Sequence, residues 1–347
     1  MSATPQRQLA SVGQTAPQRT AAASAPAVVS HLHCSSIEQL EAVFRGAGQQ
    51  LELLQLDPGL FEAQVWRLQL PPLKLMRVRL NRAIHTQGMK LPGHLTVSLS
   101  LQAPLVAQPV RSHGRELPDT CLFGMDNKLE VHVHTPARSD LGFVMVAPEE
   151  LRRWAARLGV ELPEDGCIAS NWLQLDAQRY EGLRRYLVEL FSLIEQRPEQ
   201  LERPKLARLV LEDLIPLLLE ALVHGAGLQR RLLRAPARLE LVQIAQQWMA
   251  EHPFEPITLD ALCREIHVGR RSLIQGFRDH LGLGPMAYLK LQRLHGVRRL
   301  LVEAQPGQTR ITEVAATWGF LNPGHFARDY RRLFGERPSE TLAAGRR

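Results

Sequence analysis

The feature that most constrains this chain is an internal repeat near its C-terminal end. Apolar or small residues at positions i, i+3, i+4 and i+7 occur twice, 52 positions apart. A second set follows, 53 positions apart, of an apolar residue, an aromatic residue, a glycine and a proline. The first copy contains Leu259, Leu262, Cys263, Ile266, Leu273, Phe277, Gly282 and Pro285, and the second contains Ile311, Val314, Ala315, Trp318, Phe326, Tyr330, Gly335 and Pro338. Eight matched positions with a single one-residue shift indicate a duplicated structural unit.

Each copy predicts two short helices joined by a tight turn. The first helix buries one apolar stripe and places a small residue, Cys263 or Ala315, where the second helix crosses it. The turn holds His267 in one copy and Gly319 in the other, and a positive φ there favours glycine. The second helix buries two side chains and leaves a polar, basic face. This pattern is typical of a helix-turn-helix, whose second helix enters the DNA major groove.

The two copies and the segment between them resemble the DNA-binding domain of the AraC/XylS transcriptional regulators. The resemblance is carried by LCREIHVGRRSLIQGFRDHLGLGPMAYLKLQRLHGVRRLL and ITEVAATWGFLNPGHFARDYRRLFGERPSE. It implies an AraC-type DNA-binding domain over residues 236–347, all-α, with two helix-turn-helix motifs joined by a linker helix. Within the family, IHVGRRSLIQGF, LGLGPMAYLK and VRRLL are most similar to regulators of ethanolamine utilisation, which implies ethanolamine with adenosylcobalamin as the effector.

One position departs from the family pattern. Family members usually have serine at the start of the first recognition helix, whereas this chain has Gly269. Glycine still serves as an N-cap at a loss of only a few tenths of a kcal/mol. The fold is therefore expected to be kept, and a hydroxyl contact to phosphate is lost.

The second helix of each copy is expected to contact DNA. A solvated helix face is the alternative, but both copies place basic and amide side chains on the same face. Matched by position to the family motif, Arg271, Gln275, His325 and Arg328 resemble base-reading residues, since arginine bonds guanine as a fork and glutamine suits adenine. Arg278, Arg331 and Arg332 are expected to hold phosphates, and Asp329 to orient an arginine. The expected DNA-binding residues are Arg270, Arg271, Gln275, Arg278, Asn322, His325, Arg328, Arg331 and Arg332.

The charge distribution agrees with a nucleic-acid partner. The formal net charge is +7, and residues 236–347 carry 16 Lys plus Arg against 11 Asp plus Glu. Most of the excess therefore lies in the part that resembles a DNA-binding domain, where it favours an anionic polymer.

The upstream residues predict an α+β chain with a β-rich barrel-like or sandwich-like sensor domain and trailing helices. Residues 1–29 contain no acidic residue and offer little apolar surface to bury, so they predict a disordered tail. A capping-box pattern predicts a helix over 35–44. Alternating runs predict strands at 63–70, 75–85, 94–101, 128–134 and 142–147, and apolar spacing predicts helices at 148–159, 177–196 and 204–225. Residues 30–235 are thus expected to bind an effector and dimerise, with a boundary near Pro236.

Two other patterns allow more than one interpretation. Glu130, His132 and His134 alternate on one predicted strand, which fits either a metal site or the solvent face of an edge strand. A second pattern lies in LVLEDLIPLLLEALV, whose apolar stripe fits either an oligomer interface or packing against the chain's own sheet. That stripe consists of Val210, Leu214, Leu217 and Ala221.

Several classes of protein are not expected. Cys34, Cys121, Cys167 and Cys263 form no close pair, so reduced thiols are expected rather than disulfides or a zinc ribbon. The chain has no run of eighteen apolar residues and no signal-peptide pattern, so we expect a cytoplasmic protein without a membrane partner. No nucleophile elbow, P-loop or GxGxxG is present, so neither catalysis nor a cofactor or metal is expected.

The sequence therefore predicts a transcription regulator that binds double-stranded DNA and responds to a small molecule. RNA polymerase and a second copy of the chain are further expected partners. A cupin-like metalloenzyme or a ligand-independent repressor, each fused to a DNA-binding domain, are the alternatives. Residues 285–301 predict a linker helix of about 25 Å, since a helix rises about 1.5 Å per residue. Two recognition helices at its ends would then lie about 34 Å apart, one turn of B-DNA.

Overall fold

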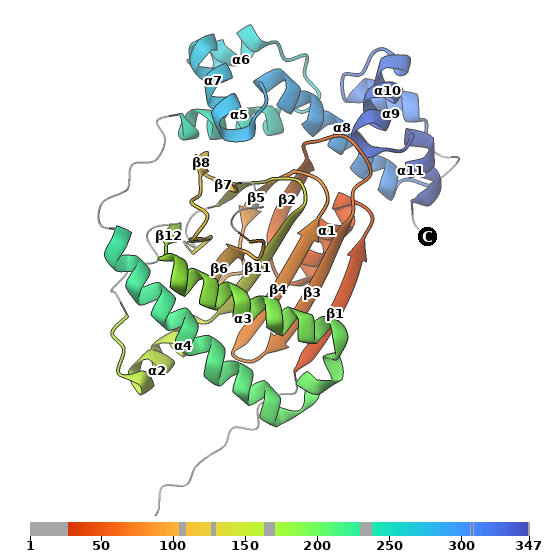
Figure 1. The fold of residues 1–347 in the computed structure, drawn as a ribbon. Helices are drawn as coiled ribbons and strands as arrows, with labels where there is room; N and C mark the ends of the chain where they lie inside the picture. Colours follow the sequence, from red (N-terminus) through yellow and green to blue (C-terminus); the bar gives the residue numbers. More distant parts are fainter. Residues whose placement is uncertain are drawn as a thin grey trace, which may run out of the picture.

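The structure is a computed structural model that describes residues 27–103, 109–125, 130–162, 171–229 and 238–345, except 306 and 308. In these ranges the chain forms a β-rich part with covering helices, followed by an all-helical part (Figure 1). The predicted α+β fold class is confirmed. The predicted boundary at residues 235 and 236 lies outside the described residues.

Two antiparallel sheets form the β-rich part. The larger sheet has the strand order β1-β3-β4-β11-β6-β9-β12, and the smaller has the order β2-β5-β10-β7-β8. The strands of the larger sheet are β1 (Val28–Cys34), β3 (Ala63–Leu70), β4 (Leu73–Leu80), β6 (Leu95–Ser100), β9 (Cys121–Phe123), β11 (Ser139–Val146) and β12 (Trp172–Gln174). The strands of the smaller sheet are β2 (Gln50–Gln55), β5 (Ile84–Met89), β7 (Arg111–Ser112), β8 (Arg115–Glu116) and β10 (Val131–Thr135).

The predicted strands are present, with two differences. The strand predicted over 75–85 is divided into β4 and β5, because the chain leaves the larger sheet after Leu80 and enters the smaller sheet at Ile84. The tail predicted over 1–29 is wrong at its end, because Val28 and Val29 already pair with β3. Residues 1–26 lie outside the described residues.

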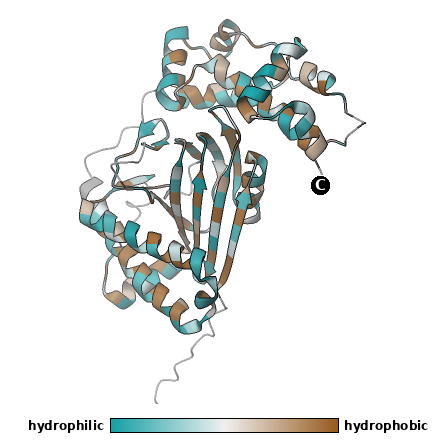
Figure 2. Ribbon diagram, turned by 45° about the vertical axis from the view of Figure 1, so that its right-hand side comes forward, coloured by the Kyte–Doolittle hydropathy of each residue, from teal (hydrophilic) through white to brown (hydrophobic). Residues whose placement is uncertain are grey.

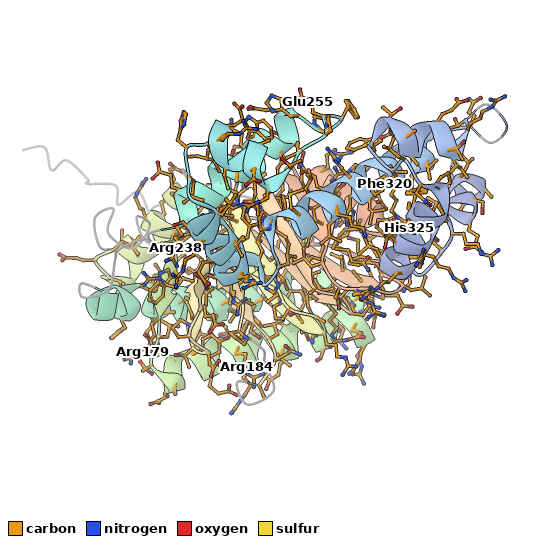
Figure 3. The ribbon with its side chains drawn as sticks, turned by 90° about the horizontal axis from the view of Figure 1, so that it is seen from above. Arg179, Arg184, Arg238, Glu255, Phe320 and His325 are labelled. Atoms are coloured by element: carbon orange, nitrogen blue, oxygen red, sulfur yellow. The ribbon has the colours of Figure 1, made fainter. Side chains whose placement is uncertain are left out.

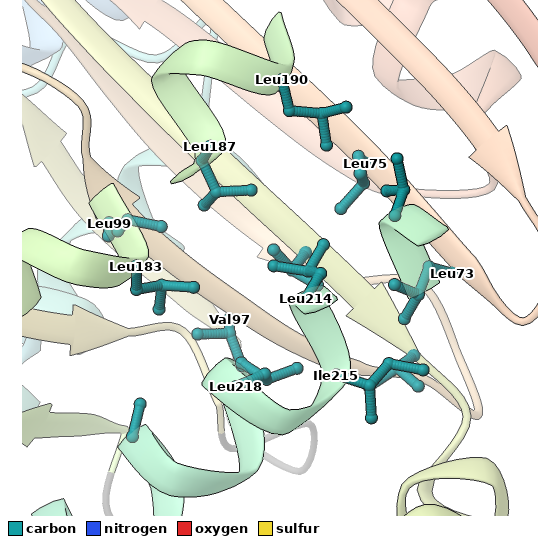
Figure 4. Close-up of a cluster of buried hydrophobic side chains, with 14 of the residues drawn as sticks. Leu73, Leu75, Val97, Leu99, Leu183, Leu187, Leu190, Leu214, Ile215 and Leu218 are labelled. Atoms are coloured by element: carbon teal, nitrogen blue, oxygen red, sulfur yellow. The ribbon is translucent and has the colours of Figure 1, made fainter. Parts of the chain in front are cut away.

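Helices cover the outer face of the larger sheet. Figure 1 shows α3 and α4 lying across it, and Figure 4 shows their leucines packed against Leu73, Leu75, Val97 and Leu99 of the sheet. The apolar stripe of α4 belongs to this core: Val210, Leu214 and Ala221 are buried, and Leu217 is half-buried. The interpretation of this stripe as an oligomer interface is therefore wrong. The helices of this part are α1 (Ile37–Gly46), α2 (Pro148–Leu158), α3 (Ala177–Gln196), the 3-10 helix η1 (Pro198–Glu202) and α4 (Pro204–Gln229).

The helical part is built around α8, which contributes to two separate cores. Tyr288 and Leu289 near its start pack in the first core, and Leu294, Val297 and Leu301 pack in the second. In Figure 2 the apolar residues of these helices appear as brown bands among hydrophilic teal ones. The helices are α5 (Leu239–Glu251), α6 (Leu259–Glu265), α7 (Arg270–Leu281), α8 (Pro285–Glu303), α9 (Ile311–Thr317), α10 (Pro323–Phe334) and α11 (Pro338–Ala344).

The sequence predicts reduced cysteines and no membrane-spanning segment, and the structure bears on both predictions. Cys34, Cys121 and Cys263 are free thiols, and Cys167 lies outside the described residues. None of the helices in the described ranges combines the length and apolar character needed to cross a bilayer.

Candidate nucleic-acid interface

The predicted repeat forms two helix-turn-helix motifs of matching dimensions. In the first motif α6 has 7 residues and α7 has 12, and in the second motif α9 and α10 have the same lengths. The turns adopt a positive φ at His267 (56°) and Gly319 (83°). The second helices both end at a left-handed glycine, Gly282 or Gly335, with φ of 73° and 74°. The sequence-based prediction of this duplicated unit is confirmed.

The second helix of each motif buries one face and exposes the other. Leu273 and Phe277 of α7 are buried, as are Phe326 and Tyr330 of α10. All nine predicted DNA-binding side chains are exposed, so DNA could reach them. Eight lie on the two recognition helices, and Asn322 caps the start of α10. These side chains are Arg270, Arg271, Gln275, Arg278, Asn322, His325, Arg328, Arg331 and Arg332.

Carboxylates accompany the polar face of the first motif. The guanidinium of Arg270 pairs with Asp260 of α6, with Nε 2.5 Å from Oδ1. Gln275 donates from Nε2 to Oδ1 of Asp279 over 2.6 Å, and Asp279 also pairs with Arg238 at 3.3 Å. Because these side chains are largely exposed, water and salt weaken the pairs, and a DNA phosphate can displace the carboxylates.

The second motif differs in its polar contacts. Asn322 accepts the backbone N–H of His325 at Oδ1 over 3.0 Å, so its oxygen caps α10. Asp329 pairs with Lys290 of α8, with Nζ 2.6 Å from Oδ2. The prediction that Asp329 orients an arginine is therefore wrong, because α10 turns this residue toward the linker helix. In the described residues, Arg328, Arg331 and Arg332 have no carboxylate within ion-pair distance.

A groove beside α10 contains a basic residue that the sequence analysis missed. The groove has a volume of about 790 Å³ and lies between α10 and the starts of α9 and α11. Arg337 lines it together with Arg328, Arg331 and Arg332. The repeat gave no signal for Arg337, because the corresponding position of the first copy, 53 residues earlier, is Gly284.

The linker helix α8 separates the two motifs. It spans 19 residues, two more than predicted, and begins at Pro285 in the first helical position. At a rise of about 1.5 Å per residue it is about 28 Å long. Viewed from above in Figure 3, Glu255, which precedes the first motif, lies apart from His325 of the second motif.

The helical part is docked on the β-rich part through buried polar contacts of α8. Arg298 pairs with Glu38 of α1 at 3.1 Å and with Glu336 at 2.6 Å, and Arg299 pairs with Glu41 of α1 at 3.0 Å. Burial opposes the charge of Arg298, but the adjacent carboxylates raise its pKa above the ordinary value. His295 is fully buried, which lowers its pKa to about 4 and keeps the ring neutral near pH 7.

The pair His132 and His134 lies near this docked surface and not on an edge strand. Strand β10 is bordered by β5 and β7, so the interpretation as an edge strand is wrong. His132 Nε2 lies 3.5 Å from a carboxylate oxygen of Glu130, and its ring centroid is 6.2 Å from that of His85. Burial, followed by the neighbouring histidines, lowers the pKa of His85 to about 3. In the described ranges no three His, Cys, Asp or Glu residues are arranged to hold a metal ion.

A small cavity lies between the two sheets. Its volume is about 70 Å³, and its lining comes from α1, from β4, β6, β9 and β11 of the larger sheet, and from β2, β5 and β10 of the smaller sheet. The lining is mainly apolar, with Gln49, Lys90, Thr96 and Ser98 among its polar residues. Thr96 is buried, and its hydroxyl has no hydrogen-bond partner among the described residues.

Comparison with known proteins agrees with this geometry. A family described as "Helix-turn-helix domain" matches residues 262–344. The chain is 35% identical over 196 residues to the "Probable thc operon regulatory protein" of Rhodococcus erythropolis, covering 54% of this chain and 56% of the relative. It is 39% identical over 97 residues to the "XylDLEGF operon transcriptional activator 2" of Pseudomonas putida, covering 28% of this chain and 62% of the relative. The chain thus spans less than two thirds of either relative.

A solved structure is similar as well. A "probable AraC family transcriptional regulator" from Rhodopseudomonas palustris is 38% identical, covers 31% of this chain and 99% of its own, and has a TM-score of 0.29. The sequence relatives are regulators of the thc and xyl operons, and they do not support the finer resemblance to regulators of ethanolamine utilisation. The family match, the sequence relatives and the duplicated geometry together make residues 262–344 of this chain a helix-turn-helix domain.

Proposed function

We propose that this protein is a transcription regulator that binds DNA sequence-specifically through both motifs and responds to a small molecule. The observation that carries the proposal is the pair of exposed basic helices, α7 and α10, at the two ends of one linker helix. Arg271, Gln275, His325 and Arg328 read bases, since their side chains are exposed and carry the donors that base edges require. Arg270, Arg278, Arg331 and Arg332 hold phosphates.

Two contacts support changes to the proposed set of DNA-binding residues. Asn322 contributes at most its amide N–H groups, because its oxygen caps α10. Arg337 joins the phosphate-holding set, since it lines the same groove as Arg328, Arg331 and Arg332. Three arginines in one groove, Arg331, Arg332 and Arg337, suit one strand of the phosphate backbone.

The cavity between the sheets is the proposed effector site. It has an apolar lining and a few polar groups, which is the usual composition of small-molecule sites. The unpaired hydroxyl of Thr96 offers a hydrogen bond to a ligand. Ethanolamine with adenosylcobalamin remains a candidate to test, although no carboxylate of the described lining would pair with its ammonium group.

RNA polymerase and a second copy of the chain are the proposed macromolecular partners of such a regulator. The stripe on α4 does not provide the dimer contact, because it is buried in the chain's own core. A cupin-like metalloenzyme gains no support from the described residues, among which no three His, Cys, Asp or Glu side chains are grouped so that they could hold a metal ion. A ligand-independent repressor is the remaining alternative, and it has the same DNA-binding surface.

The test uses the full chain. DNA fragments selected by the protein from random sequence define an operator, and operator affinity and melting temperature are then measured with a panel of small metabolites. A regulator that senses a ligand is stabilised by the ligand that it binds, since binding to the folded state raises the melting temperature. The panel includes ethanolamine with adenosylcobalamin. If several hundred compounds change neither quantity, the ligand-independent repressor is the better description.

A further inference from the structure

The last residues of one strand of the smaller sheet, β2, contact the helical part. Gln55, its last residue, is 1% exposed. Its side-chain Nε2 lies 2.8 Å from the carbonyl oxygen of Leu333 in α10, and its backbone N–H donates to Nε2 of His295 in α8 over 3.0 Å. Just beyond the strand, the N–H of Gly59 donates to the same Leu333 carbonyl over 3.0 Å. The end of β2 and the residues just after it are therefore hydrogen-bonded both to the second motif and to the linker helix.

The same strand and its neighbour also contact the first motif. Leu54 of β2 is buried in the core formed by α5, α6, α7 and the start of α8, where it packs with Phe277 and Tyr288. His85 of β5 lies beside Gln246 of α5, with 3.3 Å between Nε2 atoms, and its ring centroid is 6.3 Å from that of Tyr288. The β2–β5 pair thus contacts both motifs at once.

The opposite face of this strand pair lines the cavity. Successive side chains of a strand point to opposite faces, so Leu51, Ile84 and Thr86 line the cavity while Leu54 and His85 face the helices. The two strands pair along their whole length, from Gln50 opposite Met89 to Gln55 opposite Ile84. A displacement of the cavity wall therefore displaces the residues that hold the helical part.

The cavity has to widen to accept a ligand of ordinary size. Its volume of about 70 Å³ lies below the roughly 300 Å³ at which ligand pockets usually begin. The wall formed by β4, β6 and β11 is interior to the larger sheet and backed by the core with α3 and α4. By contrast, β2 is an edge strand whose ladder in its sheet is with β5. When the cavity widens, we therefore expect the wall formed by β2 and β5 to move more than the wall formed by β4, β6 and β11.

We propose that the β2–β5 strand pair transmits occupancy of the cavity to both helix-turn-helix motifs, with Leu54, Gln55 and His85 as its contacts. This inference rests on the proposed effector function of the cavity. A ligand that moves β2 outward presses Leu54 and His85 against the first motif and strains the hydrogen bonds of Gln55 with α8 and α10. The relative placement of the two recognition helices then depends on the ligand.

The experiment fills the cavity by substitution, so no effector has to be known. Ser98 of β6 is buried, lines the cavity and lies in the larger sheet, whereas β2 and β5 lie in the smaller one. Ser98→Leu in the full chain is compared with the milder Ser98→Val and with Ser30→Leu, a control on the outer strand β1. Hydrogen exchange is followed at the amides of Gln55 and Gly59, which both bond to the helical part, and at Val144 in β11.

The expected result is exchange about tenfold faster at Gln55 and Gly59, with Val144 unchanged, because local opening releases only the bonds of that element. Ser98→Val should give a smaller effect in the same direction, and it carries the test if Ser98→Leu does not fold. Wild-type exchange at both reporter amides would overturn the proposal, as would equal acceleration at Val144 or in Ser30→Leu. Failure of the effector function is distinguished by operator affinity that no metabolite changes while the reporter amides still respond to Ser98→Leu.

Discussion

The two helix-turn-helix motifs share one backbone and differ in the charges on their surfaces. Their helices have the same lengths, and their recognition helices end at glycines with nearly the same φ. In the first motif, carboxylates of Asp260 and Asp279 accompany Arg270 and Gln275. At the two corresponding positions of the second motif stand Thr312 and Arg332. The buried residues of the repeat thus keep the fold, while the exposed residues have diverged.

This difference implies different contributions to DNA binding. Phosphate contacts supply most of the affinity for any sequence, and base contacts supply the discrimination. The second motif has three arginines without a carboxylate partner in the described residues, and a groove that adds Arg337. We expect it to supply the larger share of the affinity. The first motif, with carboxylates beside Arg270 and Gln275, is expected to bind more weakly and to depend more on the correct bases.

The largest expected effect comes from the spacing of the two DNA blocks that the motifs read. One chain is expected to read blocks about 10 base pairs apart, one turn of B-DNA. Inserting about five base pairs turns one block to the opposite side of the duplex. The two motifs should then no longer bind at the same time, and only binding by the second motif should remain. Inserting about ten should also fail, because the helix α8 cannot lengthen. Gel-shift titrations measure both, and normal binding after the longer insertion would show that α8 does not fix the spacing.

Much of this comparison could be predicted from the sequence, because both motifs repeat a buried pattern. Phe277 and Tyr330, and Gly282 and Gly335, are set by local helix geometry and by packing within about 30 residues. The pairing of Asp329 with Lys290 could not be predicted, because it depends on how α10 crosses α8. The repeat did not indicate Arg337, because the corresponding residue of the first copy is Gly284.

The docking of the β-rich part was also beyond prediction. Gln55 contacts Leu333, which lies 278 positions later in the chain. The sequence around Gln50–Gln55 shows no clean alternation, because both faces of the strand are covered, one by the cavity and one by the helices. A strand of this kind carries no periodic signal that assigns its faces.

The second largest effect is expected from the packing of α8 against the second motif. A Cβ atom on Gly296 would lie 2.1 Å from the ring of Trp318, whereas a Cβ on Gly276 in the first motif would lie 3.0 Å from Val242. Gly296→Ala should therefore destabilise the protein by about 1–3 kcal/mol through overpacking, and Gly276→Ala by clearly less. Urea denaturation followed by tryptophan fluorescence measures both. Gly182→Ala, which meets no atom within 4 Å, is the control. Equal losses at the two sites would contradict the tighter packing of the second motif.

The next effect concerns base reading by the matched arginines. Arg271→Ala and Arg328→Ala should each weaken operator binding by about 1–3 kcal/mol and relax the preference at one operator position, since each removes a fork-like base contact. Affinities for the operator, for single-base variants and for random DNA are measured at one salt concentration. Arg185→Ala on the exposed surface of α3 serves as the control. If operator and random DNA lose the same free energy, these arginines contact phosphates only.

The smallest effect is expected at Asp279, the carboxylate that most distinguishes the first motif from the second. Asp279→Asn removes a negative charge beside the DNA-facing side of α7, so affinity for any duplex should rise by about 0.2–1 kcal/mol, the range of exposed charge pairs. It also leaves Gln275 without its carboxylate acceptor, so the adenine preference at that position should weaken as the amide becomes free to turn. Glu199→Gln in η1 makes the same charge change away from the helical part and should alter neither quantity. Titrations at several salt concentrations separate the two effects, because the charge effect shrinks with added salt and the loss of preference does not. Unchanged affinity together with unchanged preference would mean that Asp279 and Gln275 lie outside the contact with DNA. The different surface charges of the two motifs would then not imply different contributions to DNA binding.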